Sequence, residues 1–354
     1  MFKSILVPTD GSDNANAALQ LGADLAAKYG AKLTLLHVAF RGGEISAARA
    51  QEAESRFETA LQAEGKSPSR HPEWSREHQV LDYLGEVILD EAASTARDQG
   101  AINIDTQLDY GATSERVLYW EKHAGADLIV MGSRGYSELQ GLLLGSVSHT
   151  VHHQCDATCV TVKQREGGPT DAFSGIATVL AAVDGSDHAF EAVEVASDIA
   201  SKYGARLAIV HVKLKSATVK KLLDMVDAQQ LSADTQQFLH DRQTRHGSAW
   251  ALDFGLASTT PAKQVFAEVG ELVLLKAKRL AERKGITDVS THLDNGDPAA
   301  QIVARAGQEH ADLIVLGDRG LGEVKGMLVG SVSNKIQHLA PCTAISVKQS
   351  KRAQ

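Results

Sequence analysis

The stretch Asp127-Leu128-Ile129-Val130-Met131-Gly132-Ser133-Arg134-Gly135 determines the fold, and the chain contains it twice. The second form reads Asp312-Leu313-Ile314-Val315-Leu316-Gly317-Asp318-Arg319-Gly320. In each, the apolar run predicts a buried parallel strand and the glycines predict a tight turn. At the same interval after each turn a small-polar segment opens a helical pattern, namely Gly145-Ser146-Val147-Ser148 and Gly330-Ser331-Val332-Ser333. A strand, a glycine turn and a helix N-terminus in this order are typical of phosphate binding in α/β proteins.

The repeat extends over most of the chain. Residues 5–38 match residues 179–212, and the match resumes where Gly85 corresponds to Gly270, after a connection that is longer in the second copy. Strands and helices alternate in each copy; in the first we predict strands near 3–8, 33–38, 102–107, 127–131 and 158–162. This alternation predicts the α/β class, with two doubly wound domains, each a five-stranded parallel sheet of strand order 3-2-1-4-5 with helices on both faces.

The domain boundaries follow from the repeat. We predict a first domain at 1–165, a linker at 166–175 that is marked by Gly, Pro and polar residues, and a second domain at 176–349. The long connections at 40–82 and 213–268 predict solvated helices with a few aromatics facing the core, and a lid or a partner surface is the alternative.

Composition excludes several classes of function. The 354 residues include 36 Lys and Arg against 44 Asp and Glu, a net charge of -8, so nucleic acid is not an expected partner. No apolar run reaches the roughly 20 residues of a membrane helix, and we expect no membrane association. The N-terminus does not resemble a secretory signal, and Cys155, Cys159 and Cys342 are too few for a disulfide framework. We therefore expect a cytoplasmic protein.

Polar residues follow the strands whose carboxyl ends flank the expected crevice. Asp10 and Asp184 follow the first strand of each copy, where each carboxylate could accept a hydrogen bond from a ribose hydroxyl or help to hold a divalent cation; a turn-and-cap role is the alternative. Glycines at 132, 135 and 145 would let backbone N–H groups approach phosphate. The hydroxyl and amide of Ser146, with Ser148 one turn on, would donate to phosphate at a positive helix end.

The histidines give no second site. His152 and His153 lie near Cys155 and Cys159, but the four-ligand spacing of a structural zinc site is not met, so we predict no metal site. His37 and His211 occupy equivalent places in the second strand of each copy and are expected to be buried and hydrogen-bonded.

Both copies resemble the universal stress protein family. The resemblance rests on a first strand that ends in Asp, a later D-L-I-V strand, and G-x-x-G-x9-G-S, which together mark the ATP-binding branch of that family. It implies an adenine nucleotide ligand, ATP or AMP/ADP, with Mg²⁺, and backbone contacts from Val38 and Val212 to the adenine; these valines could instead be plain core residues. From motif and resemblance together, the predicted nucleotide-binding residues are Pro8, Thr9, Asp10, Val38, Gly132, Arg134, Gly135, Gly145, Ser146, Val147 and Ser148 in the first copy, and Val183, Asp184, Val212, Gly317, Arg319, Gly320, Gly330, Ser331, Val332 and Ser333 in the second.

The second copy departs from the first at two positions. Val183 replaces Thr9, which removes a hydroxyl, and Asp318 replaces Ser133, which adds a carboxylate beside the phosphate turn. Such a charge repels phosphate unless Mg²⁺ or Arg319 compensates it. We predict that the second site binds ATP more weakly, or with a greater dependence on Mg²⁺.

The expected function is nucleotide-dependent conformation or partner binding in stress response or signalling. The chain has no P-loop and no kinase motif set, and no base candidate recurs in both copies, so we predict no catalytic residue. The resemblance allows slow ATP hydrolysis or autophosphorylation. The alternatives are an ATP-dependent ligase or nucleotidyl transferase, and a scaffold with vestigial sites.

The last strand of each copy predicts an assembly surface. Residues 158–162 and 343–347 are apolar edges. The resemblance implies an intramolecular pseudo-dimer joined at these edges; a homodimer and an unidentified protein partner stay open.

Overall fold

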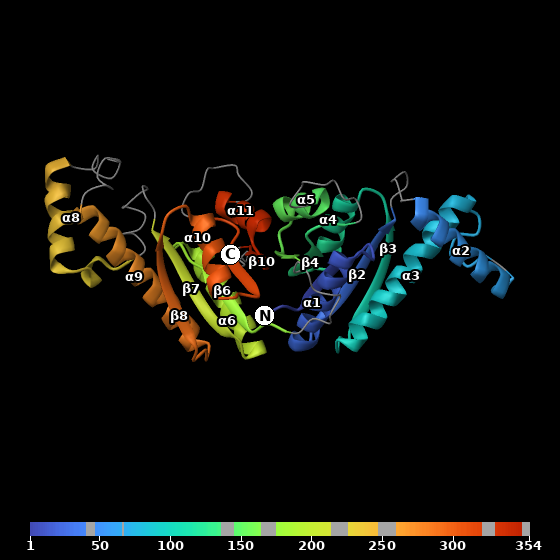
Figure 1. Cartoon of the computed structure of the whole chain (residues 1–354), viewed down its shortest axis with the longest axis horizontal. Helices are drawn as coiled ribbons and strands as arrows, with labels where there is room; N and C mark the ends of the chain where they lie inside the picture. Colours follow the sequence, from blue (N-terminus) through green and yellow to red (C-terminus); the bar gives the residue numbers. More distant parts are fainter. Residues whose placement is uncertain are drawn as a thin grey trace. The chain divides into compact units, whose positions relative to one another are not determined.

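The structure, a computed structural model, describes residues 1–39, 47–65, 67–135, 145–163, 175–213, 226–246, 260–320 and 330–348. The chain divides into Met1–Phe173, called domain 1 here, and Ser174–Gln354, called domain 2. The border between them falls within the predicted linker 166–175, of which only Gly175 is among the described residues. Each domain is shown in Figure 1 with its elements labelled.

Domain 1 contains a five-stranded parallel sheet in the order β3-β2-β1-β4-β5, so the predicted order is confirmed. Its elements are β1 (Ser4–Pro8), α1 (Asp13–Tyr29), β2 (Lys32–Ala39), α2 (Ala47–Glu64), α3 (Arg76–Asp98), β3 (Ile104–Tyr110), α4 (Thr113–His123), β4 (Leu128–Gly132), α5 (Ser146–Gln154) and β5 (Thr158–Val162).

Domain 2 repeats this sheet in the order β8-β7-β6-β9-β10, also parallel throughout. Its elements are β6 (Thr178–Ala182), α6 (Asp187–Tyr203), β7 (Arg206–Lys213), the 3-10 helix η1 (Ala228–Gln230), α8 (Ala233–His246), α9 (Thr260–Arg283), β8 (Val289–Asn295), α10 (Pro298–Gln308), β9 (Leu313–Gly317), α11 (Ser331–Leu339) and β10 (Thr343–Val347).

Helices cover both faces of each sheet because the central strands are apolar on both sides. In β1, β4 and β5 nearly every residue is buried. In domain 1, α1 and α3 pack side by side on one face, and α4 with α5 on the other; α6 with α9 and α10 with α11 repeat this in domain 2 (Figure 1).

The first helix of each domain begins and ends as its sequence predicts. The Ser12 hydroxyl accepts a hydrogen bond from the Ala15 N–H (3.3 Å), and Gly30 ends α1 at a φ of 63°. Ser186 and Gly204 do the same for α6.

The long connection in domain 1 is helical and is held by a buried carboxylate. Phe57 of α2 packs edge-on against Tyr83 of α3, with ring centroids 5.6 Å apart. Asp82, fully buried on α3, accepts hydrogen bonds from the Ser69 hydroxyl (2.6 Å), the Arg70 N–H (2.7 Å) and the Tyr110 hydroxyl (2.5 Å). Burial raises the pKa of the Asp82 carboxyl, but these donors outweigh burial and hold the pKa below its usual value.

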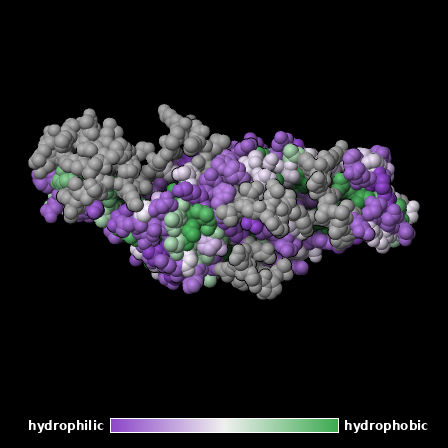
Figure 2. Space-filling model, turned by 45° about the horizontal axis from the view of Figure 1, so that its top comes forward, coloured by the Kyte–Doolittle hydropathy of each residue, from purple (hydrophilic) through white to green (hydrophobic). Residues whose placement is uncertain are grey.

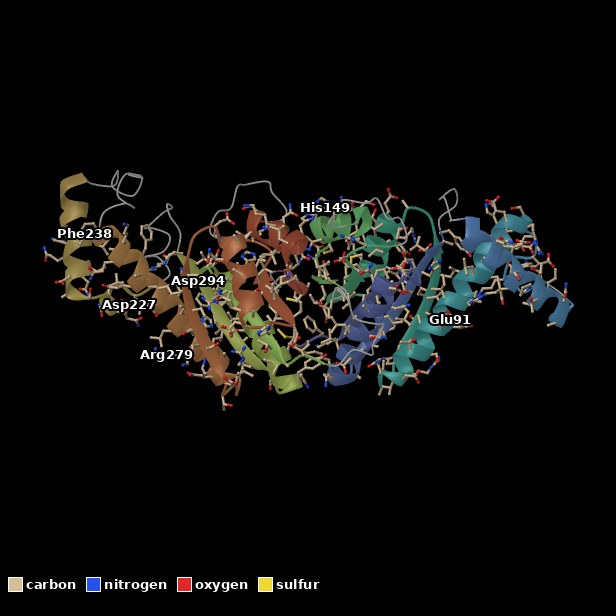
Figure 3. The ribbon with its side chains drawn as sticks, viewed as in Figure 1. Glu91, His149, Asp227, Phe238, Arg279 and Asp294 are labelled. Atoms are coloured by element: carbon tan, nitrogen blue, oxygen red, sulfur yellow. The ribbon has the colours of Figure 1, made fainter. Side chains whose placement is uncertain are left out.

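In both domains an aspartate ties the end of the third strand to the following helix. Asp109 accepts hydrogen bonds from Arg116 (2.7 Å) and the Trp120 indole (2.6 Å). Asp294, labelled in Figure 3, accepts two from Arg305 (3.1 and 2.6 Å). The carboxylate therefore recurs with different donors.

The surface shown in Figure 2 is mainly hydrophilic, with separate apolar areas. Among the described residues, the exposed large apolar side chains are Met1, Ile102, Tyr119, Leu275 and Leu339. Within the same part of the chain, no helix has the length and apolar character needed to span a bilayer. Two aromatic residues of the second predicted connection, Trp250 and Phe254, lie outside the described residues.

Candidate functional site

The aspartate after the first strand meets the glycine turn after the fourth in each domain. β1 and β4 are neighbours in the sheet, so their carboxyl ends lie together. Asp10 Oδ1 accepts a hydrogen bond from the Ser12 N–H (3.0 Å), and a Cβ at Gly135 would lie 2.6 Å from Asp10 Oδ2. Asp184 and Gly320 stand in the same relation. A side chain at the second glycine of each turn would therefore force the aspartate carboxylate to shift.

The first glycine of each turn serves packing between the strand and the first helix. A Cβ at Gly132 would lie 2.8 Å from the backbone of Asn14, and one at Gly317 would lie 3.0 Å from the backbone of His188. Sequence reasoning gave this glycine the task of clearing the backbone for a ligand. In the structure, this glycine lets the turn pack closely against the N-terminus of the first helix.

The helix after each turn begins without a side-chain cap. Gly145 precedes α5 and Gly330 precedes α11, and neither helix start has a capping side-chain hydrogen bond. The glycine N–H groups donate instead to the turn, from Gly145 to the Ser133 carbonyl (2.8 Å) and from Gly330 to the Asp318 carbonyl (2.7 Å). First-turn N–H groups have no acceptor within their own helix. Those of residues 146–148 and 331–333 thus form a donor set for an anion beside the turn.

The side chains of these first turns divide into two groups. Ser146 and Ser331 are exposed. The half-buried Val147 and Val332 pack on the hydrophobic core, which leaves only their backbone for a ligand.

The hydroxyls of Ser148 and Ser333 face inward. Ser148 is buried, and its hydroxyl donates toward the carbonyls of Ser133 (3.1 Å) and Gly145 (3.0 Å). The Ser333 hydroxyl lies 2.7 Å from that of Ser346. Ser148 thus ties α5 to the turn, and Ser333 ties α11 to β10. Only the backbone N–H groups of the two serines remain for a ligand.

The second strand directs backbone groups past the end of the first. The Thr9 N–H donates to the Leu36 carbonyl (2.8 Å), and backbone groups two residues apart on a strand face the same side. Those of Val38 therefore face the space beyond half-buried Pro8. The Val183 N–H donates to the Val210 carbonyl (2.9 Å) and places Val212 likewise.

A histidine of the second strand supports the peptide before each site aspartate. His37 Nδ1 lies 2.9 Å from the Thr9 carbonyl, and His211 Nδ1 lies 2.7 Å from the Val183 carbonyl. Since a carbonyl only accepts, each Nδ1 carries the proton. Burial lowers the pKa of His211, which is 2% exposed. Both are hydrogen-bonded, as the sequence predicts; His211 is fully buried and His37 half-buried.

The two departures in domain 2 have defined partners. The buried Thr9 hydroxyl accepts from the Gly11 N–H (3.3 Å), so its replacement by Val183 removes a turn hydrogen bond. Asp184 instead accepts a hydrogen bond from the Ser186 hydroxyl (2.6 Å). Asp318 is buried and forms an ion pair with Lys348 (Nζ to Oδ2, 3.4 Å), a residue that the prediction did not name.

Sequence reasoning missed Lys348 and His188. Lys348 follows the last strand, and His188 lies on the first turn of α6, with its Nε2 4.0 Å from Asp318 Oδ1. Position-by-position comparison of the two copies would have found His188, which replaces Asn14, but not Lys348, because Lys163 stands at the equivalent place. The arginines also differ: Arg134 is exposed, whereas Arg319 is half-buried.

His152, Cys155 and Cys159 of domain 1 are buried. His152 is buried on α5, where His149 is labelled in Figure 3, and the Cys155 thiol lies 3.4 Å from the Ala157 carbonyl. None of the three cysteines forms a disulfide, and all three are buried.

Comparisons with known proteins agree with this architecture. The sequence model of the Universal stress protein family matches residues 1–163 and 175–348. A universal stress protein of Mycolicibacterium smegmatis is 26% identical over 347 residues, covering 97% of this chain and 96% of the relative. One of Thermus aquaticus is 32% identical over 171 residues, 48% of this chain and 98% of the relative. The crystal structure of a universal stress protein from Archaeoglobus fulgidus superposes with a TM-score of 0.59 at 21% identity, covering 99% of this chain and 97% of the other, and shows the same fold. With one match in each half, the chain belongs to the universal stress protein family as a tandem of two family domains.

Proposed function

We propose that each domain binds an adenine nucleotide where its first and fourth strands end, with ATP as the first ligand to test and Mg²⁺ as its counter-ion. One observation carries this proposal: in both copies an aspartate touches the second glycine of the turn, next to a helix start that has no side-chain cap. A ligand that bears a hydroxyl near one end and phosphate at the other matches an acceptor followed by a row of N–H donors.

Each part of the site has a role in binding. The Asp10 carboxylate accepts from a ribose hydroxyl, and the N–H groups at the start of α5 donate to phosphate. The Val38 backbone faces the base. Asp184, Val212 and the start of α11 repeat these roles in domain 2. Mg²⁺ would neutralise phosphate oxygens, with carboxylate as the protein oxygen ligand nearest to them.

Nucleotide binding then stabilises one conformation or one partner surface, and family membership supports a role in stress response or signalling. The site residues bind and orient, and the chain supplies at most slow ATP hydrolysis or autophosphorylation. Docking of the two domains through β5 and β10, a homodimer, and a cytoplasmic location stay predictions.

The test is to purify the chain, extract any bound small molecule with acid and identify it by chromatography and mass spectrometry. Titration calorimetry with ATP, ADP and AMP, each with and without Mg²⁺, then gives affinity and stoichiometry. The expected result is a co-purified adenine nucleotide and two binding events per chain. Absence of bound nucleotide, together with no thermal shift with ATP and Mg²⁺, would indicate a scaffold. Sustained multiple turnover of ATP would indicate an enzyme.

A further inference from the structure

A buried ion cluster lies beneath the glycine turn of domain 2. The Asp318 side chain is 5% exposed and lies 3.4 Å from Lys348 Nζ and 4.0 Å from His188 Nε2. Lys348 itself is only 9% exposed. The charges of the cluster are therefore shielded from water. Buried charges are screened less than charges at an open surface, so they act over a longer range.

Domain 1 has different residues at two of the same three places. The Ser133 N–H donates to the Val162 carbonyl and the Asp318 N–H donates to the Val347 carbonyl, both at 2.9 Å, so the two side chains start from the same point. Lys163 and Lys348 each come next after those acceptors in the chain. Asn14 takes the place of His188, since each packs its backbone against the first glycine of its turn. The acidic residue under the turn is thus specific to domain 2.

The cluster is coupled directly to the donor set. The Asp318 carbonyl accepts from the Gly330 N–H (2.7 Å), and Gly330 is the residue before the first turn of α11. A phosphate bound at that turn would therefore lie next to the residue that carries the carboxylate.

The charge under the two donor sets differs by one unit. Both turns carry an arginine and both last strands are followed by a lysine, but in domain 2 the positive charge of Lys348 is offset by Asp318. Repulsion by a fixed carboxylate grows with the charge of the ligand, and each further phosphate of a nucleotide adds negative charge. The penalty thus falls on the triphosphate more than on the monophosphate.

We propose that the second site selects adenine nucleotides by phosphate charge and binds the monophosphate class in preference to the triphosphate, whereas the first site prefers the triphosphate. This selectivity rests on the proposed nucleotide site. The two domains then report on different members of the adenine nucleotide pool. Asp318 acts as a specificity-determining residue, and the ion pair with Lys348 holds its carboxylate in place.

The experiment measures the ratio of the AMP and ATP dissociation constants at one site at a time, in the full-length chain. Gly135→Ala isolates the second site and Gly320→Ala isolates the first, because the added Cβ of each collides with its aspartate. Fluorescent AMP and ATP analogues are titrated in Mg²⁺ buffer. In the Gly135→Ala background we expect tighter binding of AMP than of ATP.

Two reciprocal variants test the role of the carboxylate. Asp318→Asn in the Gly135→Ala background keeps the shape and removes the charge, and we expect the preference to move toward ATP by about tenfold. Ser133→Asp in the Gly320→Ala background should move the first site toward AMP by a similar factor, and it remains informative where Asp318→Asn fails to fold.

Failure of selectivity and failure of the binding site give different results. If both sites bind nucleotide with the same preference, or if both variants leave the preference unchanged, the selectivity is wrong and the nucleotide sites stand. If neither nucleotide binds either site of the unmodified chain, the proposed function fails and the selectivity fails with it.

Discussion

The two domains hold the same backbone site over different side chains. In each, an aspartate contacts the second glycine of a turn and a helix begins uncapped beside it. Under that frame domain 1 has Ser133 and domain 2 has Asp318 with Lys348. The difference teaches that the backbone geometry of the site is maintained by glycine and aspartate, while the charge beneath it varies independently. Four changes break or sharpen this comparison.

The largest expected effect comes from removing the counter-charge in domain 2. Lys348→Met leaves a buried carboxylate without its partner, and breaking a buried pair in this way costs about 3–5 kcal/mol. Lys163→Met in domain 1 should cost less, because Ser133 is neutral. Hydrogen exchange measured by mass spectrometry on peptides from β9 and β4 resolves the two domains. Equal losses in both variants would contradict the ion cluster, and Lys348→Met with Asp318→Ser should recover most of the lost stability.

The second effect tests the contact that the domains share. Gly135→Ala places a methyl group 2.6 Å from Asp10 Oδ2, so the carboxylate must move away from its ligand position. We expect nucleotide affinity at the first site to fall by about 2 kcal/mol, roughly thirtyfold. The matched control is Gly307→Ala in α10, where a Cβ would meet no heavy atom within 4 Å. Equal affinity in the two variants would show that Asp10 does not contact the ligand.

The third effect separates the domains by pH. Burial lowers the pKa of His211 and of His292, both in domain 2. The unfolded chain therefore takes up protons below about pH 6.5 that the folded domain resists, and stability falls as the pH falls. Each such histidine contributes up to about 1.4 kcal/mol to this loss of folding free energy for every pH unit. His211→Gln should flatten the decline in urea unfolding curves of domain 2; an unchanged slope would exclude His211 as its source.

The smallest effect concerns the second residue after α4 in domain 1 and after α10 in domain 2. Domain 1 has Gly125 there, at a φ of 57°, and domain 2 has His310, at a φ of 49°. A residue with a Cβ is strained in this region, so His310→Gly should stabilise domain 2 by about 1 kcal/mol. Gly125→His should destabilise domain 1 by a similar amount. Thermal unfolding of both variants checks the pair, and a lower midpoint for His310→Gly would reverse the interpretation.

The fold could be predicted from sequence because its determinants are local and repeated. The apolar runs before Gly132 and Gly317, the Ser12 cap and the Gly30 stop each specify an element through nearby residues. The approach of Asp10 to Gly135 followed from topology, since neighbouring parallel strands end at one edge.

Side-chain direction could not be predicted in the same way. Ser148 reads as a ligand residue in the sequence, yet its hydroxyl turns inward to the Ser133 carbonyl. Asp318 reads as an uncompensated charge because its partners, His188 and Lys348, lie far from it in the chain. The hydrogen bonds to Asp82 were missed because two of its donors, Ser69 and Arg70, lie in a connection without a repeat partner.

Because α5 and α11 begin without a side-chain cap, the order of their first turns should depend on whether an anion is bound there. A helix whose first turn lacks an acceptor frays, and a small anion that binds there restores the missing hydrogen bonds. The amide exchange rates of residues 146–148 and 331–333 then fall as the ligand concentration rises. Ser146 and Ser331 lie exposed on these turns. Under the proposed function, a change in nucleotide concentration therefore changes the rigidity of these two helix starts, and a partner that binds there would respond to it.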